Sequence, residues 1–290
     1  MNRSLQASLR VLLAACLALV TAYASAAEGE TLKAIKARNA VVVGFLSDAF
    51  PISFVDKDGQ PAGYSIDLCR AIAEAAGKAA GLESVKVRYV PLTLEERFDA
   101  VANGKVDIEC GTSTITLSRM RKVDFTNTVF LDGGSLLVRR GSAISSIPAL
   151  VDETIAVIPG TTTEKALRET LEKRYVNAKV VEVKNHAEGM AALEAGTASA
   201  YASDRVLLVG LLLGTNNLEN FAMVPDQFSY EPYGFAVRRN DADFRLVANS
   251  TLARLSSSGK IYKIFEHWFG AIGNPNPGLV TMYLINATPE

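Results

Sequence analysis

The stretch IAVIPGTTTE, residues 155–164, contains the two local signals from which the fold can be worked out. Its first four residues are apolar and include β-branched side chains, a pattern typical of a short buried strand. Thr161 and Glu164 then stand three residues apart, the spacing of a capping box that begins a helix. A buried strand followed at once by a capped helix predicts α/β architecture.

The same alternation recurs on both sides of this stretch. Thr93 and Asn185 each precede a Glu by three residues, and Gly104 and Gly196 are placed to end the helices that follow. Further apolar runs predict strands over residues 41–43, 85–87, 106–108 and 180–183. We therefore expect largely parallel sheets.

The strands and helices form two series, over residues 41–130 and 154–224. Two extended segments, 135–138 and 233–237, lie between and after them. If the second segment returns the chain to the first series, the last predicted helices, which cover 244–255 and 261–269, belong to the first lobe.

The expected protein has two lobes joined by two crossing strands, with a cleft between them where ligand sites tend to form. Lobe 1 would comprise residues 27–133 and 235–290, and lobe 2 residues 134–234. Gly133, Gly134 and Gly234 are candidates for hinge positions, although ordinary turns also use glycine.

Composition points to a soluble globular protein with a small partner. Hydrophobic residues make up 49% of the chain and charged residues 21%. The chain has 30 Lys and Arg against 31 Asp and Glu, with no basic stripe, so nothing suggests binding to nucleic acid.

The first 26 residues have the pattern of an export signal. Arg3 and Arg10 are followed by an apolar run over 11–23 and by the small-x-small sequence Ala24-Ser25-Ala26. We expect cleavage near Ala26. A membrane anchor is the alternative, but the run is shorter than the roughly 20 residues of a spanning helix. A lipoprotein box ending at Cys16 is disfavoured because the apolar run continues past it.

Removal of this segment would leave two cysteines, Cys69 and Cys110. An even pair in an oxidising compartment favours a disulfide, and the alternative is two buried free thiols.

A series of short motifs, taken in order, resembles one known family. The motifs are GYSIDL (63–68), GKVD (104–107), TLSR (116–119) with VDFT (123–126), PGTT (159–162), AYASD (200–204) and YGFAVR (233–238). In this order they are similar to the polar amino-acid-binding family of bacterial solute-binding proteins. ECGTST (109–114) and Asn185-His186 further resemble its glutamate/aspartate-binding branch.

The resemblance implies a periplasmic protein of type II two-lobed fold, with two crossover hinge strands and no cofactor. Such a protein closes around a free L-amino acid and delivers it to the membrane permease subunits of an ABC importer. We expect it to act as a monomer.

The residues within these motifs suit a free amino acid. Arg119 offers a planar bidentate donor for the carboxylate, worth roughly 1.5 to 3 kcal/mol. Thr162 adds a hydroxyl and a backbone N–H at a helix N-terminus. Asp204 supplies the counter-charge for the ammonium, with Thr112 or Thr114 as neutral acceptors.

Each assignment has a structural alternative. Arg119 could be a solvated surface charge, and Thr161 with Thr162 could simply cap a helix. Asp204 could be the N-cap of an apolar helix over 206–213.

At the end of the site expected to bind the ligand side chain, this chain differs from the glutamate/aspartate-binding branch that it resembles. That branch has an arginine after the first strand, where this chain has Leu46. Arg97 and His186 match positions that the branch uses near the ligand side chain, although Arg97 could pair with Glu96 or Asp99 and His186 could be structural. A buried carboxylate short of a partner is costly. We therefore expect the loss of a cation at Leu46 to favour amides or less polar side chains over acidic ones.

Phe50, Tyr64 and Tyr230 are candidate apolar walls beside the ligand, although aromatic residues are more often core. Tyr64 is the strongest of the three because it precedes a predicted helix facing the cleft.

An enzyme is the main alternative function, because related folds include periplasmic dehydratases. Against it, the only histidines are His186 and His267, and no nucleophile triad, metal-spaced ligand set or phosphate loop is present. A third possibility is a protein-partner module that has lost its ligand.

Overall fold

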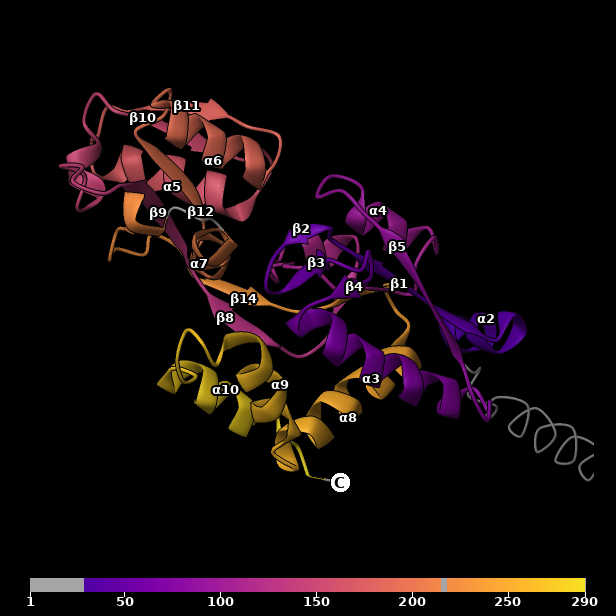
Figure 1. The fold of residues 1–290 in the computed structure, drawn as a ribbon. Coiled ribbons are helices and arrows are strands. Elements are labelled where there is room, and N and C mark those ends of the chain that lie inside the picture. Colours follow the sequence, from indigo (N-terminus) through magenta and orange to yellow (C-terminus); the bar gives the residue numbers. More distant parts are fainter. Residues whose placement is uncertain (1–28, 215–217, 290) are drawn as a thin grey trace, which may run out of the picture.

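The computed structural model describes residues 29–214 and 218–289, so the predicted export signal lies outside the described residues. The described chain forms two lobes, each built on a five-stranded sheet (Figure 1). The sheet orders are β5-β1-β6-β15-β7 in the first lobe and β11-β10-β12-β9-β13 in the second.

The sheet of the first lobe has a parallel and an antiparallel half. β1 (Ala40–Phe45) pairs in parallel with β5 (Lys86–Pro91) and β6 (Ile108–Glu109). β15 (Ala236–Val237) runs antiparallel to both β6 and β7 (Asp124–Phe125). The sheet is mixed rather than largely parallel because β15 returns from the other lobe and runs in the opposite direction.

Helices cover this sheet and enclose an extensive apolar core. The helices of the first lobe are α2 (Glu30–Arg38), α3 (Tyr64–Ala79), α4 (Arg97–Ala102), the 3-10 turn η1 (Arg119–Arg121), α8 (Ala242–Ser257), α9 (Lys260–Phe269) and α10 (Pro277–Asn286). A small antiparallel sheet is formed by β2 (Asp48–Ala49), β3 (Ser53–Val55) and β4 (Pro61–Ala62).

The C-terminal segment packs against the first lobe. Asn276 caps α10, and Leu279, Met282 and Tyr283 are buried in the core of this lobe. The Asn286 side chain donates a hydrogen bond to the Thr128 carbonyl at 2.6 Å. The helix therefore braces the chain just before it leaves this lobe.

The second lobe repeats the plan with a smaller core. β10 (Thr154–Val157) pairs in parallel with β11 (Lys179–Glu182) and β12 (Ala200–Asp204). β9 (Gly134–Arg139) is antiparallel to β12 and to β13 (Phe221–Met223). The helices are α5 (Thr162–Lys173), α6 (His186–Ala195), α7 (Arg205–Gly214) and the 3-10 turns η2 (Ile147–Leu150) and η3 (Leu218–Asn220).

Two strands join the lobes, β8 (Phe130–Asp132) and β14 (Glu231–Tyr233), which pair antiparallel between the two sheets (Figure 1). This corrects the sequence prediction. The segment 135–138 lies inside β9, within the sheet of the second lobe, and 233–237 is divided between β14 and β15. Each crossing strand is only three residues long and includes an acidic residue, Asp132 or Glu231, so the apolar pattern marked the neighbouring sheet strands instead.

The proposed hinge glycines allow close packing instead of unusual dihedral angles. None of Gly133, Gly134 and Gly234 has a positive φ. A Cβ at Gly133 would lie 2.5 Å from the Ser229 carbonyl oxygen, and one at Gly134 would lie 2.6 Å from the Phe228 ring. Any side chain here would push β8 away from the segment that leads into β14.

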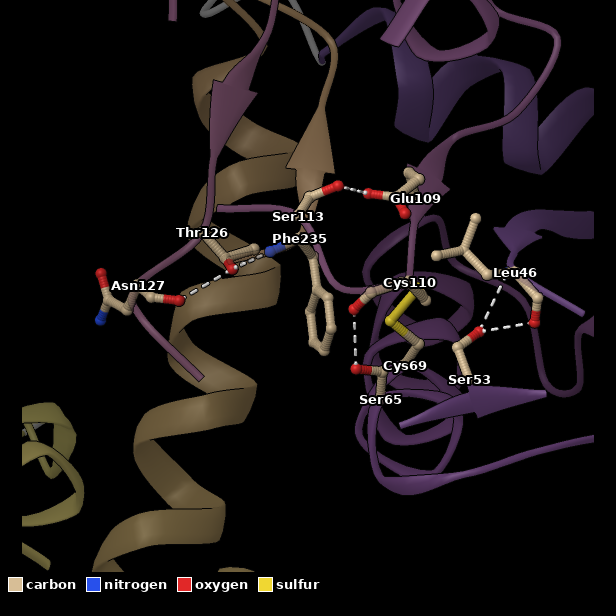
Figure 2. The surroundings of a disulfide bond; sticks show 11 residues. Leu46, Ser53, Ser65, Cys69, Glu109, Cys110, Ser113, Thr126, Asn127 and Phe235 are labelled. Atoms are coloured by element: carbon tan, nitrogen blue, oxygen red, sulfur yellow. Dashed lines mark hydrogen bonds between the residues drawn. A yellow bond between two sulfur atoms is a disulfide. The ribbon is translucent and has the colours of Figure 1, made fainter. Parts of the chain in front are cut away.

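A disulfide joins Cys69 of α3 to Cys110, which directly follows β6 (Figure 2). Both cysteines are fully buried, and the bridge closes a sequence separation of 41 residues. Nearby, Ser65 of α3 donates a hydrogen bond to the Gly111 carbonyl at 3.1 Å. The bridge thus fixes the end of β6, which leads to the functional site. Within the described part of the chain, none of the helices has the length and apolar character to cross a membrane.

Candidate functional site

A cavity between the lobes contains most of the predicted site residues. Its walls come from α4, η1 and the loop after β6 in the first lobe, and from the end of β12, the segment after β10 and the starts of α5, α6 and α7 in the second. The lining residues are Leu94, Arg97, Thr112, Arg119, Ile158, Thr161, Thr162, Thr163, His186, Ala202, Ser203, Asp204 and Leu207.

Arg119 is held in place on the first lobe. Its Nη1 donates a hydrogen bond to the Thr114 carbonyl at 2.8 Å, and its guanidinium carbon lies 5.1 Å from the centre of the Phe98 ring. Burial, with a further contribution from the Arg97 charge, lowers the pKa of Arg119 to about 10. The side chain remains a cation at neutral pH. Because it is half-buried and lines the cavity, the surface-charge alternative does not describe it.

Three consecutive threonines begin α5 on the opposite wall. The Thr161 hydroxyl accepts from the Glu164 N–H at 3.0 Å and donates to the Ile158 carbonyl, so capping occupies it. The Thr162 hydroxyl instead lies 3.2 Å from that of Thr114, across the lobe boundary. Thr162 can thus contact a ligand at a helix N-terminus, where negative charge is favoured.

Asp204, at the end of β12, is a buried and ordered carboxylate. Thr163 donates to its Oδ1 and Tyr233 donates to its Oδ2. Burial and the nearby Glu231 raise the pKa of Asp204. Asp204 is not the cap of α7, because the Val206 N–H donates to Asp132 at 2.9 Å. Its two oxygens therefore accept hydrogen bonds from Thr163 and Tyr233, and the side chain lines the cavity.

Thr112 lines the cavity directly, whereas Thr114 lies just behind it. The Thr114 hydroxyl donates to Glu231 Oε2 at 2.6 Å, and Ser229 donates to the other oxygen of Glu231 at 2.7 Å. Thr114 therefore links the first lobe to the hinge strand β14 as well as to Thr162.

Arg97 projects into the cavity with unused donors. Its side chain is buried, and its Nε and Nη1 have no hydrogen-bond partner among the described residues. The predicted alternative pairs are wrong, because Glu96 pairs with Lys105 at 3.1 Å and Asp99 pairs with Lys122 at 2.6 Å. Burial lowers the pKa of Arg97. A ligand acceptor would satisfy these donors.

Figure 2 shows Leu46 and Glu109 near the disulfide, and the Glu109 carboxyl is close enough to Arg97 to interact with its charge. A Cβ placed on Gly111 would be 2.3 Å from Glu109 Oε1 and 3.0 Å from Leu46 Cδ1, so both side chains flank this glycine. Ser113 donates to Glu109 Oε2 at 2.6 Å, but Oε1 has no partner in the described chain. Burial raises the pKa of Glu109, and the Arg97 charge opposes this shift. Glu109 is thus a counter-charge for Arg97.

His186 lies at the start of α6, after the cap Asn185. Its Nδ1 is 2.8 Å from the Tyr201 hydroxyl, and burial lowers the pKa of His186. The imidazole is therefore neutral at pH 7, and its other ring nitrogen has no role in the bond to Tyr201.

The predicted aromatic walls lie elsewhere. Tyr64 is fully buried in the core of the first lobe, where its hydroxyl contacts the Val129 carbonyl and the Tyr283 hydroxyl, each at 2.9 Å. The prediction that it faces the cleft is wrong because the first turn of α3 points into the core. Phe50 lines a neighbouring cavity beside His186, and Tyr230 lines a cavity behind the hinge.

The sequence prediction assigned no role to four ionisable groups around the site: Glu109, Asp132, Glu231 and Tyr233. Glu109 and Tyr233 belong to motifs that carried the resemblance, but those motifs gave no indication of what the two side chains do. Asp132 and Glu231 lie in the hinge strands, where no local pattern marks a buried carboxylate. Across residues 29–214 and 218–289, no group of His, Cys, Asp and Glu side chains is arranged to hold a metal ion.

Comparison with known proteins places these features in a family. The sequence model of bacterial extracellular solute-binding proteins, family 3, matches residues 41–271. The glutamate/aspartate import solute-binding protein of Escherichia coli (strain K12) is 32% identical over 254 residues, which cover 88% of this chain and 83% of that protein. The ABC transporter glutamine-binding protein of Bacillus subtilis (strain 168) is 30% identical, with coverages of 82% and 84%.

Solved structures share the two-lobed fold. An ancestral amino acid-binding protein, described as a precursor of cyclohexadienyl dehydratase, matches with a TM-score of 0.70 and 34% identity. The match covers 82% of this chain and 99% of that structure. The α10 helix lies beyond the residues that the family model matches.

Proposed function

Because the chain belongs to the bacterial extracellular solute-binding proteins of family 3, we propose that it binds a free L-amino acid between its lobes. One observation carries the proposal. The same cavity is lined by the Arg119 guanidinium of the first lobe and the Asp204 carboxylate of the second. A free amino acid carries the complementary charges one carbon apart, so it binds best when the lobes are closed and shifts the hinge equilibrium toward closure.

For the ligand side chain, we infer an amide rather than a carboxylate. Arg97 offers unused donors, but Glu109 offsets its charge and Leu46 supplies no second cation. Glutamine or asparagine can accept from Arg97 without adding a negative charge beside Glu109. Acidic amino acids would leave a buried carboxylate only partly compensated.

The cellular setting belongs to the same proposal. We propose export to the periplasm with cleavage near Ala26, monomeric action, and recognition of the closed form by the permease subunits of an ABC importer. Lobe 1 would span residues 27–133 and 235–290 and lobe 2 residues 134–234, consistent with the strands of the two sheets. N-terminal sequencing of the exported protein tests the cleavage site.

A thermal-shift screen of residues 27–290 against the common L-amino acids tests the function, after unfolding and refolding to remove carried-over ligand. A ligand at a thousandfold excess over its Kd adds about 4 kcal/mol of stability, which is readily measured. We expect a large shift with one or two amino acids. No shift with any of them would contradict the proposal and favour an enzyme or a protein-partner module.

A further inference from the structure

A row of hydrogen-bonding side chains connects the cavity to the hinge. Tyr233, at the end of hinge strand β14, donates from its hydroxyl to Asp204 Oδ2. On its other side the same hydroxyl lies 3.4 Å from Oδ2 of Asp132, the last residue of hinge strand β8. Asp132 Oδ2 also accepts from the Val206 N–H at the start of α7. Both hinge strands and the second lobe thus meet at one tyrosine.

This row has too few protons when both carboxylates are ionised. A tyrosine hydroxyl has a single hydrogen to donate, and here it goes to Asp204. An ionised Asp132 then faces the lone pairs of the Tyr233 oxygen. A protonated Asp132 can instead donate to that oxygen. The hydrogen bonds then run in one direction, from Asp132 to Tyr233 and from Tyr233 to Asp204, and each oxygen has a partner.

Asp132 and Asp204 open to different spaces. Asp204 lines the cavity between the lobes. Asp132 lines a separate cavity behind the hinge, together with Arg205 and Tyr230 of the second lobe and with apolar and amide side chains from α9, α10 and the loop between them. A proton on Asp132 therefore has a route to solvent that does not pass through the ligand.

The charges around the row favour one proton on this pair of carboxyls, and we assign it to Asp132 because both oxygens of Asp204 accept hydrogen bonds from hydroxyl groups. Burial, followed by the Asp204 charge, raises the pKa of Asp132 to about 7. Glu231 on β14 adds negative charge beside Asp204. The nearby cations are Arg97 of α4 and Arg119 of η1, which interact with Asp204, and Arg205 of α7, which shares the rear cavity with Asp132.

We propose that Asp132 and Tyr233 are positioning residues that couple amino-acid binding at Asp204 to the release of a proton from the hinge. The proposal rests on the proposed function. A ligand ammonium beside Asp204 offsets the negative charge that holds the proton on Asp132. The O–H bond of Asp132 then breaks and the proton leaves to solvent through the rear cavity. Tyr233 keeps its own proton and continues to donate a hydrogen bond to Asp204.

The first experiment measures the Kd of L-glutamine and of L-glutamate between pH 6 and 8. Because bound ligand favours ionised Asp132, affinity should rise with pH, by about tenfold for each unit by which binding lowers the pKa. Asp132→Asn mimics the protonated state. It should bind like the natural protein at pH 6, bind more weakly at pH 8, and lose most of the pH dependence.

Two further variants separate this coupling from a general structural effect. Tyr233→Phe removes the link and should also flatten the pH dependence, whereas a purely structural role would lower affinity equally at every pH. Asp107→Asn removes a buried carboxylate in the first lobe, paired with Arg38, and should keep the natural pH dependence. If all of these proteins show the same pH dependence, the proposal is overturned even though an amino acid binds.

A ligand-free measurement tests the row when neither glutamine nor glutamate binds, an outcome that would count against the inferred amide preference and not against the row. Folding raises the pKa of Asp132, so the native state binds the additional proton. Stability should therefore fall as pH rises from about 4, the unfolded pKa, through about 7. The fall in unfolding temperature between pH 5 and 8 should be smaller in Asp132→Asn. An equal fall in both proteins would overturn the proposal.

Discussion

The two ends of the cavity differ in how their charges are partnered. At the end proposed for the α-amino-acid group, the Arg119 guanidinium donates to the Thr114 carbonyl, and both oxygens of Asp204 accept hydrogen bonds from hydroxyl groups. At the side-chain end, Arg97 has two unused nitrogens and Glu109 one unused oxygen within the described structure.

This difference separates affinity from selectivity. A group whose orientation is already fixed loses little freedom on binding, so the first end can hold the part that all amino acids share. Buried groups without partners are costly, so the second end favours whichever side chain satisfies them. Substitutions at the first end should therefore weaken all ligands alike, and those at the second should change their order.

The largest effect is expected for Arg119→Ala. It removes a desolvated cation opposite a charged group, which costs about 3 kcal/mol or more, over a hundredfold in Kd for every amino acid. Calorimetric titration measures this. Arg121→Ala is the matched control, since Arg121 is exposed on the same 3-10 turn. Retained affinity in Arg119→Ala would show that the carboxylate binds elsewhere.

Asp204→Asn should come next. It keeps the shape of the side chain but removes the charge facing the ammonium, which costs about 2 kcal/mol, or roughly thirtyfold in Kd. Again all ligands should weaken together. If only one amino acid binds more weakly, Asp204 contacts the ligand side chain and not its ammonium group.

Leu46→Arg should change selectivity instead. We expect the added cation to improve glutamate relative to glutamine by about tenfold, near 1.4 kcal/mol. Part of its charge will be taken up by the adjacent Glu109 Oε1, so the double variant with Glu109→Gln should gain more. Competition binding at pH 7 measures the ratio. If neither variant improves the acidic ligand, Leu46 does not set selectivity.

Tyr64→Phe should have the smallest effect on binding. Tyr64 belongs to the core, so the Kd should stay within about twofold, while the lost hydrogen bonds to Val129 and Tyr283 cost about 1 kcal/mol of stability. Urea denaturation measures the second quantity. Weaker binding with unchanged stability would show that Tyr64 contributes to the ligand site.

Local signals predicted helix ends well because they depend on neighbouring residues. Thr161 caps α5 by accepting from the Glu164 N–H at 3.0 Å. The reciprocal Thr93 and Glu96 bonds of 3.1 and 3.2 Å instead close a turn, and α4 begins only at Arg97. Asn185 accepts from the Glu188 N–H, and Gly196 ends α6 with a positive φ of 74°. These features need no knowledge of the rest of the fold.

Features that depend on tertiary position were predicted less well. The crossing strands were placed too late in the chain because β9 and β15 carry the apolar runs, whereas the true hinge strands are short and each includes a carboxylate. Tyr64 was assigned to the cleft, although its hydroxyl is satisfied by Tyr283, 219 residues away. The pairing of Asp132 with Tyr233 likewise joins residues 101 positions apart, a relation that no local pattern contains.

The placement of α2 and α10 has a practical consequence for optical sensors. Both helices pack against the same lobe, so fluorescent proteins fused beyond them would move as one body when the hinge closes. Energy transfer between such fusions would hardly change on ligand addition. A useful sensor needs one fluorophore on the other lobe, for example a dye at residue 165 on the exposed face of α5, where the Lys165 side chain is 79% exposed.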